Sequence, residues 1–162
     1  MSDKQTEWTH LDAEGRLRMV DVSDKEASAR EARAEAVVRL SPETLKRIDD
    51  RVMPKGNVYE AARLAGVMAA KKTWDLIPLC HPIRITGVDV DFSSDTDASK
   101  IRIKSRVRTL DRTGVEMEAL TAAAVAALTI YDMCKAIDRG MTVESVRLLH
   151  KSGGRSGTYD RE

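Results

Sequence analysis

Aromatic side chains are scarce in this chain. They make up 4% of its 162 residues, whereas hydrophobic residues as a whole make up 42%. The length suits a single domain with one core, and that core must be built from aliphatic side chains and closely packed alanines. Small single-domain chains of this kind often bury more surface by forming oligomers.

An excess of either charge is also missing, because 27 basic residues stand against 26 acidic residues and leave a net charge of +1. A general binder of nucleic acid or of acidic membranes needs a large positive excess. We therefore predict neither nucleic acid nor a membrane as a partner. Any anionic ligand must be met by a local basic cluster.

Cysteine and histidine are rare: the chain has only Cys80, Cys134 and three histidines. Their spacing fits neither a disulfide framework nor a zinc site, so we predict no metal centre. The first residues, MSDKQTEWTH, lack the apolar segment of a secretion signal. The longest apolar run, residues 119–131, is too short to span a bilayer. These absences predict a cytoplasmic protein with reduced thiols.

The first half of the chain is predicted to alternate between strand and helix. Residues 16–23 are predicted as a short strand. Residues 30–40, REARAEAVVRL, have the composition of a helix, but apolar residues at every second position favour a half-buried strand, and we predict a strand. Ser41 as N-cap, followed by Pro42, predicts a helix. Apolar residues at helical spacing predict a second helix from Val58 to Asp75.

In the second half, residues 83–92 and 100–110 alternate and are joined by a polar turn, which predicts a hairpin. A helix from Val115 to about Asp138 and a strand at 143–152 follow. The order β-α-β-β-α-β predicts a ferredoxin-like α+β fold, in which helices pack on one face of an antiparallel sheet. A flexible N-terminal segment, a single catalytic α+β domain and a flexible glycine-rich tail are predicted at residues 1–15, 16–152 and 153–162.

The predicted long helix is polar only at Thr121 and Thr129 within residues 119–131. A helix that is apolar on nearly every side must be covered on nearly every side. One sheet covers only one side. Either a second subunit or loops of the same chain could cover the remainder.

Ionisable residues stand at both ends of this helix. Asp132 and Lys135 share one face and could exchange protons with a substrate, or they form an ordinary surface ion pair worth under ~1 kcal/mol. Glu116 and Glu118 lie in the first turn, where they could complement the helix dipole, bind a base or sugar, or act as acid and base. Glu118 and Asp132 are about 21 Å apart along the axis, so a pocket that uses both needs an extended ligand or a neighbouring chain.

Three basic segments are candidates for phosphate binding. Lys55 precedes Gly56 just before a helix, without the spacing of a P-loop. Lys151 and Arg155 flank a Ser-Gly-Gly turn, which could wrap a phosphate or belong to a disordered tail. Arg30 and Arg33 are further candidates, although most arginines are simply exposed.

The pair Cys80–His81 lies between two prolines, which hold it in an extended turn. Histidine titrates near neutrality and could position or protonate a substrate. Cys80 could be a nucleophile, a ligand or a small buried hydrophobe.

Several long motifs resemble one known family. THLDAEGRLRMVDVSDK, REARAEA, AARLAGVMAAKKTWDLIPLCHP, TGVEMEALTAAAVAALTIYDMCKA and RLLHKSGGRSG are similar to the cyclic pyranopterin monophosphate synthases, the molybdenum cofactor biosynthesis protein C family. The resemblance runs from about Thr9 to Gly157. It implies a lyase that converts 3′,8-cyclo-7,8-dihydro-GTP to cyclic pyranopterin monophosphate and pyrophosphate. It also implies a homohexamer, a trimer of dimers with pockets at subunit boundaries.

The resemblance also implies roles for individual residues. It implies no redox cofactor and leaves open whether Mg²⁺ accompanies the substrate phosphates. Pro54 and Asn57 differ from the residues that are usual in the family at these positions. These differences put the charge and flexibility of the Lys55 loop in question. The implied catalytic residues are Asp132, Lys55 and Lys135. The implied substrate-binding residues are Leu79, Cys80, His81, Met117, Glu118, Glu116, Arg30 and Lys151.

Two rival functions remain. A thiol hydrolase would use Cys80, His81 and Asp132, although neighbours in an extended turn point to opposite sides. An oligomeric anion-binding module would bind through lysines without turnover.

Overall fold

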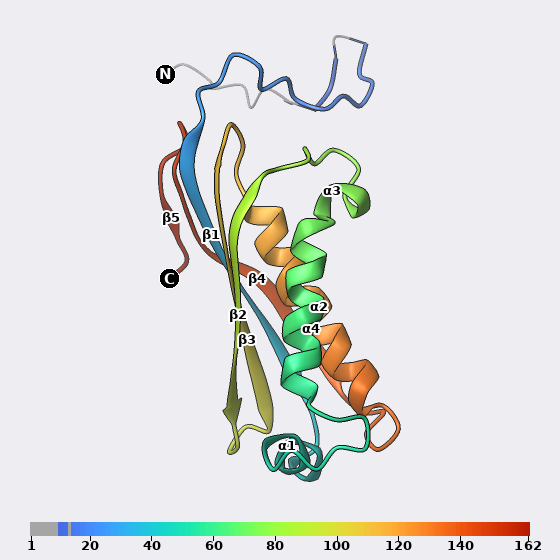
Figure 1. Cartoon of the computed structure of the whole chain (residues 1–162). Coiled ribbons are helices and arrows are strands. Elements are labelled where there is room, and N and C mark those ends of the chain that lie inside the picture. Colours follow the sequence, from blue (N-terminus) through green and yellow to red (C-terminus); the bar gives the residue numbers. More distant parts are fainter. Residues whose placement is uncertain (1–9, 13) are drawn as a thin grey trace, which may run out of the picture.

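The structure is a computed structural model that describes residues 10–12 and 14–162. Its centre is an antiparallel sheet with the strand order β2-β3-β1-β4-β5 (Figure 1). The first four strands have the order of a ferredoxin-like fold, so the predicted α+β class is confirmed. The strands are β1 (Ser28–Arg39), β2 (Ile85–Asp95), β3 (Lys100–Asp111), β4 (Thr142–Ser152) and β5 (Tyr159–Asp160).

The helices lie on one face of this sheet, as predicted, and α2 and α4 form the layer that covers it (Figure 1). The short helix α1 lies beyond one end of the sheet. The helices are α1 (Pro42–Asp49), α2 (Val58–Lys71), α3 (Thr73–Leu76) and α4 (Glu116–Cys134).

Strand β1 settles the ambiguity of residues 30–40 in favour of the predicted strand. Ala32, Ala34, Ala36 and Val38 are fully buried and face the helices. β1 is central, with β3 on one side and β4 on the other. Small side chains at every second position let α4 approach this part of the sheet closely, and this close packing outweighs the helix propensity of the segment.

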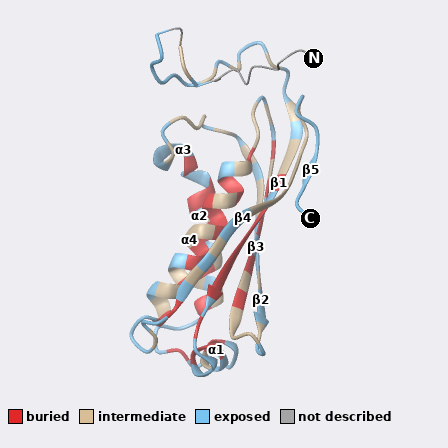
Figure 2. Cartoon of the chain, turned by 180° about the vertical axis from the view of Figure 1, so that it is seen from behind, coloured by how far each residue is buried: buried red, intermediate tan, exposed pale blue. Residues whose placement is uncertain are grey.

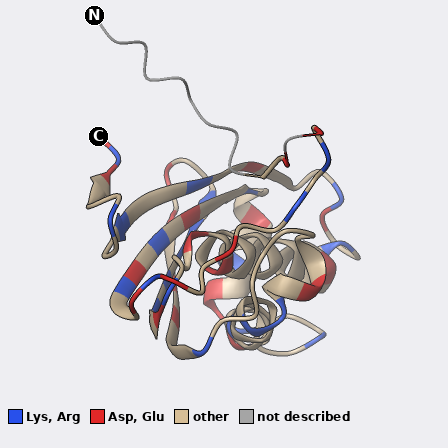
Figure 3. Cartoon of the chain, turned by 90° about the horizontal axis from the view of Figure 1, so that it is seen from above, with Lys and Arg blue, Asp and Glu red and all other residues tan. Residues whose placement is uncertain are grey.

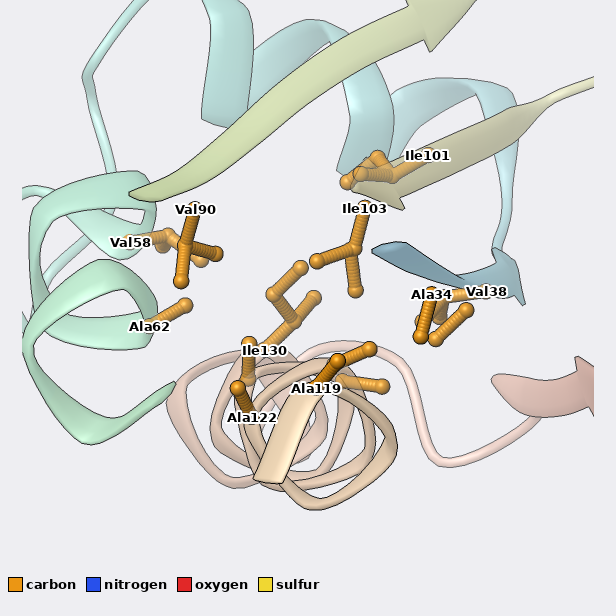
Figure 4. Packing of buried hydrophobic residues seen from close by; sticks show 14 of the residues in the cluster. Ala34, Val38, Val58, Ala62, Val90, Ile101, Ile103, Ala119, Ala122 and Ile130 are labelled. Carbon is orange, nitrogen blue, oxygen red and sulfur yellow. The ribbon is translucent and has the colours of Figure 1, made fainter. Parts of the chain in front are cut away.

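The core joins the sheet to α2 and α4 through aliphatic side chains, as the scarcity of aromatics predicted. Figure 4 shows Ile130 of α4 pointing toward Ile103, with alanines filling the remaining space. Gly66 of α2 packs tightly against α4 and β2. A Cβ atom built there would lie 3.0 Å from the Ala122 carbonyl oxygen and 3.2 Å from a Val90 methyl carbon.

The predicted strand at residues 16–23 is wrong, because this segment makes only an isolated bridge between Leu11 and Leu17. Its polar backbone groups are bound by other contacts instead: the Val20 carbonyl contacts His81 of a distant loop, and the Ser23 amide donates to the nearby Asp21 carboxylate.

Two helix ends also differ from the prediction. The helix predicted from Val58 to Asp75 breaks at Lys72, and Thr73 donates its hydroxyl to the Ala69 carbonyl instead of extending the regular turn. The long helix ends at Cys134 instead of Asp138. The Asp138 carboxylate accepts from the Ser41 and Gly140 amides, which draws residues 135–138 into a turn.

The tail predicted as flexible at residues 153–162 contains the short strand β5. Tyr159 pairs with Lys151, and Asp160 pairs with His150. The Asp160 carboxylate also accepts a hydrogen bond from His150 at 2.7 Å. The loop between β4 and β5 therefore has both of its ends on the sheet. Of the N-terminal segment predicted as flexible, residues 1–9 and 13 lie outside the described residues.

Helix α4 is longer than the apolar run from which it was predicted. With 19 residues, it is long and apolar enough to cross a membrane by length and composition alone, which corrects the argument from the length of the run. In the structure it packs on the sheet and alongside α2, and Ala119, Ala123 and Ile130 are fully buried in these contacts. This packing is that of a core helix.

The open face of the sheet carries charge. Figure 3 shows basic and acidic positions interspersed along the strands. Glu35 is buried on this face and accepts from Arg147 at 2.7 Å, while Glu31 pairs with Arg33 and Arg106. Figure 2 shows buried positions concentrated where the strands face the helices. The charged face and the apolar core therefore lie on opposite sides of one sheet.

Candidate functional site

A cavity of about 420 Å³ lies where the first turn of α4 meets the loop that follows α3. The family resemblance implies that two motifs far apart in the sequence, residues 79–81 and residues 116–118, contact the substrate. The fold brings these two motifs together here. The cavity is lined by Leu79, Cys80 and His81 of the loop and by Glu116, Met117 and Glu118 of the helix, together with His10, Val20, Val22, Lys25, Ile83, Thr113 and Gly114.

His81 is held in place by the segment that the sequence predicted as a strand. Its Nε2 lies 2.8 Å from the Val20 carbonyl oxygen. A carbonyl can only accept, so Nε2 is the donor in this contact. The contact therefore fixes the orientation of the ring.

Glu118 is buried in the same cavity, with 3% of its surface exposed. Burial raises the pKa of its carboxyl group to about 7, and the nearby charge of Glu116 acts in the same direction. At neutral pH the carboxyl group therefore exists in both protonation states. A group of this kind can accept a hydrogen bond from an N–H of a ligand or deliver a proton to it.

Cys80 is half-buried, and its backbone amide donates to the Ile77 carbonyl. Burial raises the pKa of its thiol, and the charge of Glu118 raises it further. A reactive cysteine needs the opposite environment, one that stabilises the thiolate. Cys80 is therefore better suited to packing the cavity wall than to nucleophilic attack.

A second cavity of about 760 Å³ adjoins the first, and Lys25, Thr113, Gly114 and Glu116 line both. Its other lining residues include three arginines. One end of the combined space therefore carries Glu118 and His81, and at the other end four cations outnumber the three carboxylates of Asp24, Glu26 and Glu116. The cations around the second cavity are Lys25, Arg30, Arg112 and Arg155.

Arg30 is anchored by the backbone. Its guanidinium donates to the Asp111 carbonyl at 2.9 Å and to the Arg112 carbonyl at 3.1 Å. Gly153 and Gly154, both with positive φ, wrap around it. A Cβ atom at Gly154 would overlap the guanidinium, so this turn requires glycine.

Lys151 lies near the end of β4, and its ammonium group donates to the Ser156 hydroxyl. Ser156 lines the second cavity. The lysine is thus connected to the basic cavity through the glycine-rich turn.

The three predicted catalytic residues form a separate cluster at the end of α4. The Lys135 ammonium lies 2.7 Å from one Asp132 carboxylate oxygen, and the Lys55 ammonium lies 3.3 Å from the other. Lys55 also donates to the Asp132 backbone carbonyl at 2.9 Å. Hydrogen bonds from Lys135 and then Lys55 lower the pKa of Asp132, and Asp132 in turn raises the pKa of Lys135. All three side chains are largely exposed.

The departure at Asn57 has a structural explanation. Asn57 is the N-cap of α2, and its side chain accepts from the Glu60 amide at 3.2 Å. Asparagine caps a helix about as well as aspartate. Lys55 accordingly does not lie over the N-terminus of α2 as a phosphate ligand, but reaches toward α4. The structure gives no specific account of Pro54.

The two groups of predicted residues lie at opposite ends of α4. Glu118 is in its first turn and Asp132 is in its last, about 21 Å away along the axis. One copy of the chain therefore brings together the binding residues and, separately, the catalytic residues, but not both. The rival thiol hydrolase needs Cys80 and Asp132 at one point, and a single chain does not provide that arrangement.

Sequence reasoning did not select Lys25 and Arg112, which complete the basic cavity. Arg112 also donates to the Ser23 carbonyl at 2.7 Å and so ties the N-terminal segment to the site. Lys25 lies within one of the motifs that resemble the family. A single lysine in a polar segment, however, does not by itself indicate a binding site. Among residues 10–12 and 14–162, no group of three His, Cys, Asp or Glu side chains could hold a metal ion.

Comparison with known proteins identifies the family. The MoaC family model matches residues 19–154. The chain is 58% identical over 154 residues to a cyclic pyranopterin monophosphate synthase of Pelotomaculum thermopropionicum, which covers 95% of this chain and 91% of the relative. It is 56% identical over 156 residues to a synthase of the same name from Desulfatibacillum aliphaticivorans, covering 96% and 98%. A third synthase of that name, from Thermoanaerobacter, is 58% identical over 154 residues, covering 95% and 98%. With its ferredoxin-like fold and this match over most of its length, the chain belongs to the MoaC family.

Proposed function

We propose that this chain is a cyclic pyranopterin monophosphate synthase, a lyase of molybdenum cofactor biosynthesis. Its substrate is 3′,8-cyclo-7,8-dihydro-GTP, and its products are cyclic pyranopterin monophosphate and pyrophosphate. The observation that supports this most strongly is the pair of adjoining cavities. One contains a carboxyl group and an imidazole, and the other contains four cations beside the carboxylates of Asp24, Glu26 and Glu116. A guanine-derived ring carrying a triphosphate has the same two ends.

The first cavity suits the ring system. The guanine-derived edge offers N–H donors to Glu118, and His81 and Leu79 form a wall that orients the ring. Fixing the substrate in a reactive geometry contributes to the rate because less entropy is lost at the transition state. Met117 and Cys80 supply apolar contacts at the same wall.

The second cavity suits the triphosphate. Attack of the 2′-oxygen on the α-phosphorus forms a new P–O bond, while the bond to the β-phosphate breaks and pyrophosphate leaves with its electron pair. Arg30 and Lys151, with Glu116 shaping the rim, would stabilise this leaving group. Preorganised cations at a developing negative charge contribute strongly to catalysis.

Rearrangement of the ring requires proton transfers at several atoms. In our proposal Asp132, Lys55 and Lys135 carry these transfers, including removal of the 2′-hydroxyl proton. Their mutual contacts supply an acid and a base within 3.3 Å. Positioned acid–base groups of this kind contribute about 10²–10⁴-fold to a rate.

The proposal includes an assembly and a location. We propose a homohexamer, a trimer of dimers, because the binding and catalytic residues of one chain are too far apart to serve one substrate. We assign no resident cofactor to the chain. A cytoplasmic location agrees with Cys80 and Cys134, which stand unpaired.

Incubation of the purified chain with 3′,8-cyclo-7,8-dihydro-GTP tests the function directly. Mass spectrometry should detect cyclic pyranopterin monophosphate and an equal amount of pyrophosphate. Lys55→Ala and Lys135→Ala should each abolish the product and leave the assembly intact. An anion-binding module would instead bind the substrate without converting it, and that result would reject the enzyme.

A further inference from the structure

The loop that carries His81 enters β2 through Arg84, and two side chains of β3 bind the backbone of this residue. The Arg84 amide donates to the Asp111 carboxylate at 3.2 Å, and the Arg84 carbonyl accepts from the Thr109 hydroxyl at 2.5 Å. Strand β2 begins one residue later, at Ile85. The two side chains, which we name the β3 clamp, therefore supply the partners that backbone groups at a strand end otherwise lack.

The β3 clamp fixes the course of the loop. Only Pro82 and Ile83 separate Arg84 from His81, and the proline ring restricts the backbone on both of its sides. Beyond them, the His81 ring is held at 2.8 Å from the Val20 carbonyl oxygen. The link between the clamp and the imidazole is short and stiff, so the place of His81 in the first cavity depends on where Arg84 is held.

Asp111 also contacts residues of the second cavity. Its backbone carbonyl accepts from the Arg30 guanidinium at 2.9 Å, and its carboxylate accepts from the Arg112 amide at 2.7 Å. Both arginines line the second cavity, whereas Asp111 lines neither of the two cavities. One residue therefore holds the wall of the first cavity with its side chain and a cation of the second cavity with its backbone.

We propose that Asp111 is a positioning residue, whose carboxylate sets the place of His81 relative to Arg30. The inference rests on the proposed function, because it takes one molecule to occupy both cavities. In that reaction the 2′-oxygen must lie in line with the α-phosphorus. A misplacement of about 1 Å in such a geometry lowers a rate by about 10²-fold, even when the altered residue is remote from the chemistry.

Asp95 provides the matched control. It ends β2 as Asp111 ends β3, and its carboxylate likewise accepts from a backbone amide, that of Ala98 at 2.9 Å. This contact lies within the turn between β2 and β3, at the end of the hairpin opposite to Asp111. Asp95→Ala and Asp111→Ala thus remove the same kind of contact, but only Asp111→Ala releases the loop of His81.

Steady-state kinetics with 3′,8-cyclo-7,8-dihydro-GTP test the positioning role. Asp111→Ala should lower kcat by about 10-fold or more, with a smaller change in KM. The inhibition constant of pyrophosphate should change by less than about 3-fold, because Arg30 keeps its carbonyl partner. Asp111→Asn, which retains an oxygen acceptor, should recover most of the rate, and Asp95→Ala should keep it. An equal loss in Asp95→Ala, or pyrophosphate binding that weakens as much as kcat falls, would overturn the inference.

Thr109→Val is a second variant that tests the other half of the β3 clamp. It leaves the Arg84 carbonyl without the hydroxyl donor while Asp111 keeps all of its contacts. It should show the same pattern, a lower kcat with unchanged pyrophosphate inhibition. Normal kcat in both Thr109→Val and Asp111→Ala would show that the place of Arg84 does not matter for the reaction.

Thiol alkylation measures the release of the loop independently of turnover. Cys80 is half-buried beside His81, whereas Cys134 is fully buried. Iodoacetamide should therefore modify Cys80 several-fold faster in Asp111→Ala than in the wild type or in Asp95→Ala, as followed by mass spectrometry. An unchanged rate at Cys80 would contradict the inference. Absence of product from the wild-type chain would instead reject the proposed function, and the alkylation rates would still decide whether Asp111 holds the loop.

Discussion

Burial of Glu118 beside Glu116 raises the pKa of this carboxyl group to about 7. The folded chain holds this proton more tightly than the unfolded chain, so the free energy of unfolding should fall as the pH rises from about 4.5 to about 7. Glu118→Gln removes this cost. Its unfolding free energy should exceed that of the wild type at pH 8 by up to about 3 kcal/mol, and the difference should vanish near pH 4.

Denaturant unfolding at the two pH values measures this difference. Glu35→Gln is the matched control, because Glu35 is equally buried but accepts from Arg147 at 2.7 Å. This substitution should destabilise the chain, because the guanidinium loses its carboxylate. A gain for Glu118→Gln that does not change with pH would contradict the burial argument.

Substitution of Asp132 is expected to affect catalysis but not stability, because its ion pairs with Lys55 and Lys135 are exposed. Asp132→Asn should lower the rate of product formation by about 10²–10⁴-fold but change the unfolding free energy by less than about 1 kcal/mol. Asp50→Asn, which removes the exposed pair with Lys46 on α1, should leave the rate unchanged. Steady-state kinetics and thermal unfolding of both variants provide the measurement. A large loss of stability in Asp132→Asn would mean that its role is structural.

Substitution of Cys80 distinguishes a synthase from a thiol hydrolase. Its raised thiol pKa favours the neutral form, so Cys80→Ala should retain much of the synthase activity. Product formation by this variant, compared with the wild type, provides the test. Complete loss of turnover with normal substrate binding would favour the hydrolase.

At the scale of elements, Gly66 determines how closely α2 and α4 pack. A valine there would meet the Ala122 carbonyl oxygen and Val90. Overpacking of this kind costs about 1–3 kcal/mol, so Gly66→Val should lower the Tm by roughly 3–10 °C. Lys71→Val, at an exposed position of the same helix, should change it much less. Thermal unfolding followed by circular dichroism measures the Tm of both variants. Equal shifts in Tm would show that the contact at Gly66 does not limit how closely the two helices pack.

The elements with a strong periodic pattern could be predicted from the sequence. Alternation identified β1, β2 and β3, and Ser41 with Pro42 marked the start of α1. The failures came from tertiary contacts that leave no local pattern. Val20 and Ser23 are bound by distant loops, and Asp138 is drawn to Ser41, so neither the absent strand nor the end of α4 could be read locally. For the site, the motif resemblance named the members of both clusters but not their grouping, and Lys25 and Arg112 were found only from the fold.

At the scale of the whole molecule, a charged face and an apolar core lie on opposite sides of the sheet. The two adjoining cavities lie at one end of α4, and Asp132, Lys55 and Lys135 lie at the other. In our proposal the two residue clusters act on one substrate because separate chains meet. The most direct test is to measure the molar mass of the active species by sedimentation while product formation is followed. We predict that activity travels with an assembly of at least two chains, and that activity per chain falls as dilution dissociates it. Full activity in a species of 18.0 kDa, the mass of one chain, would contradict the account.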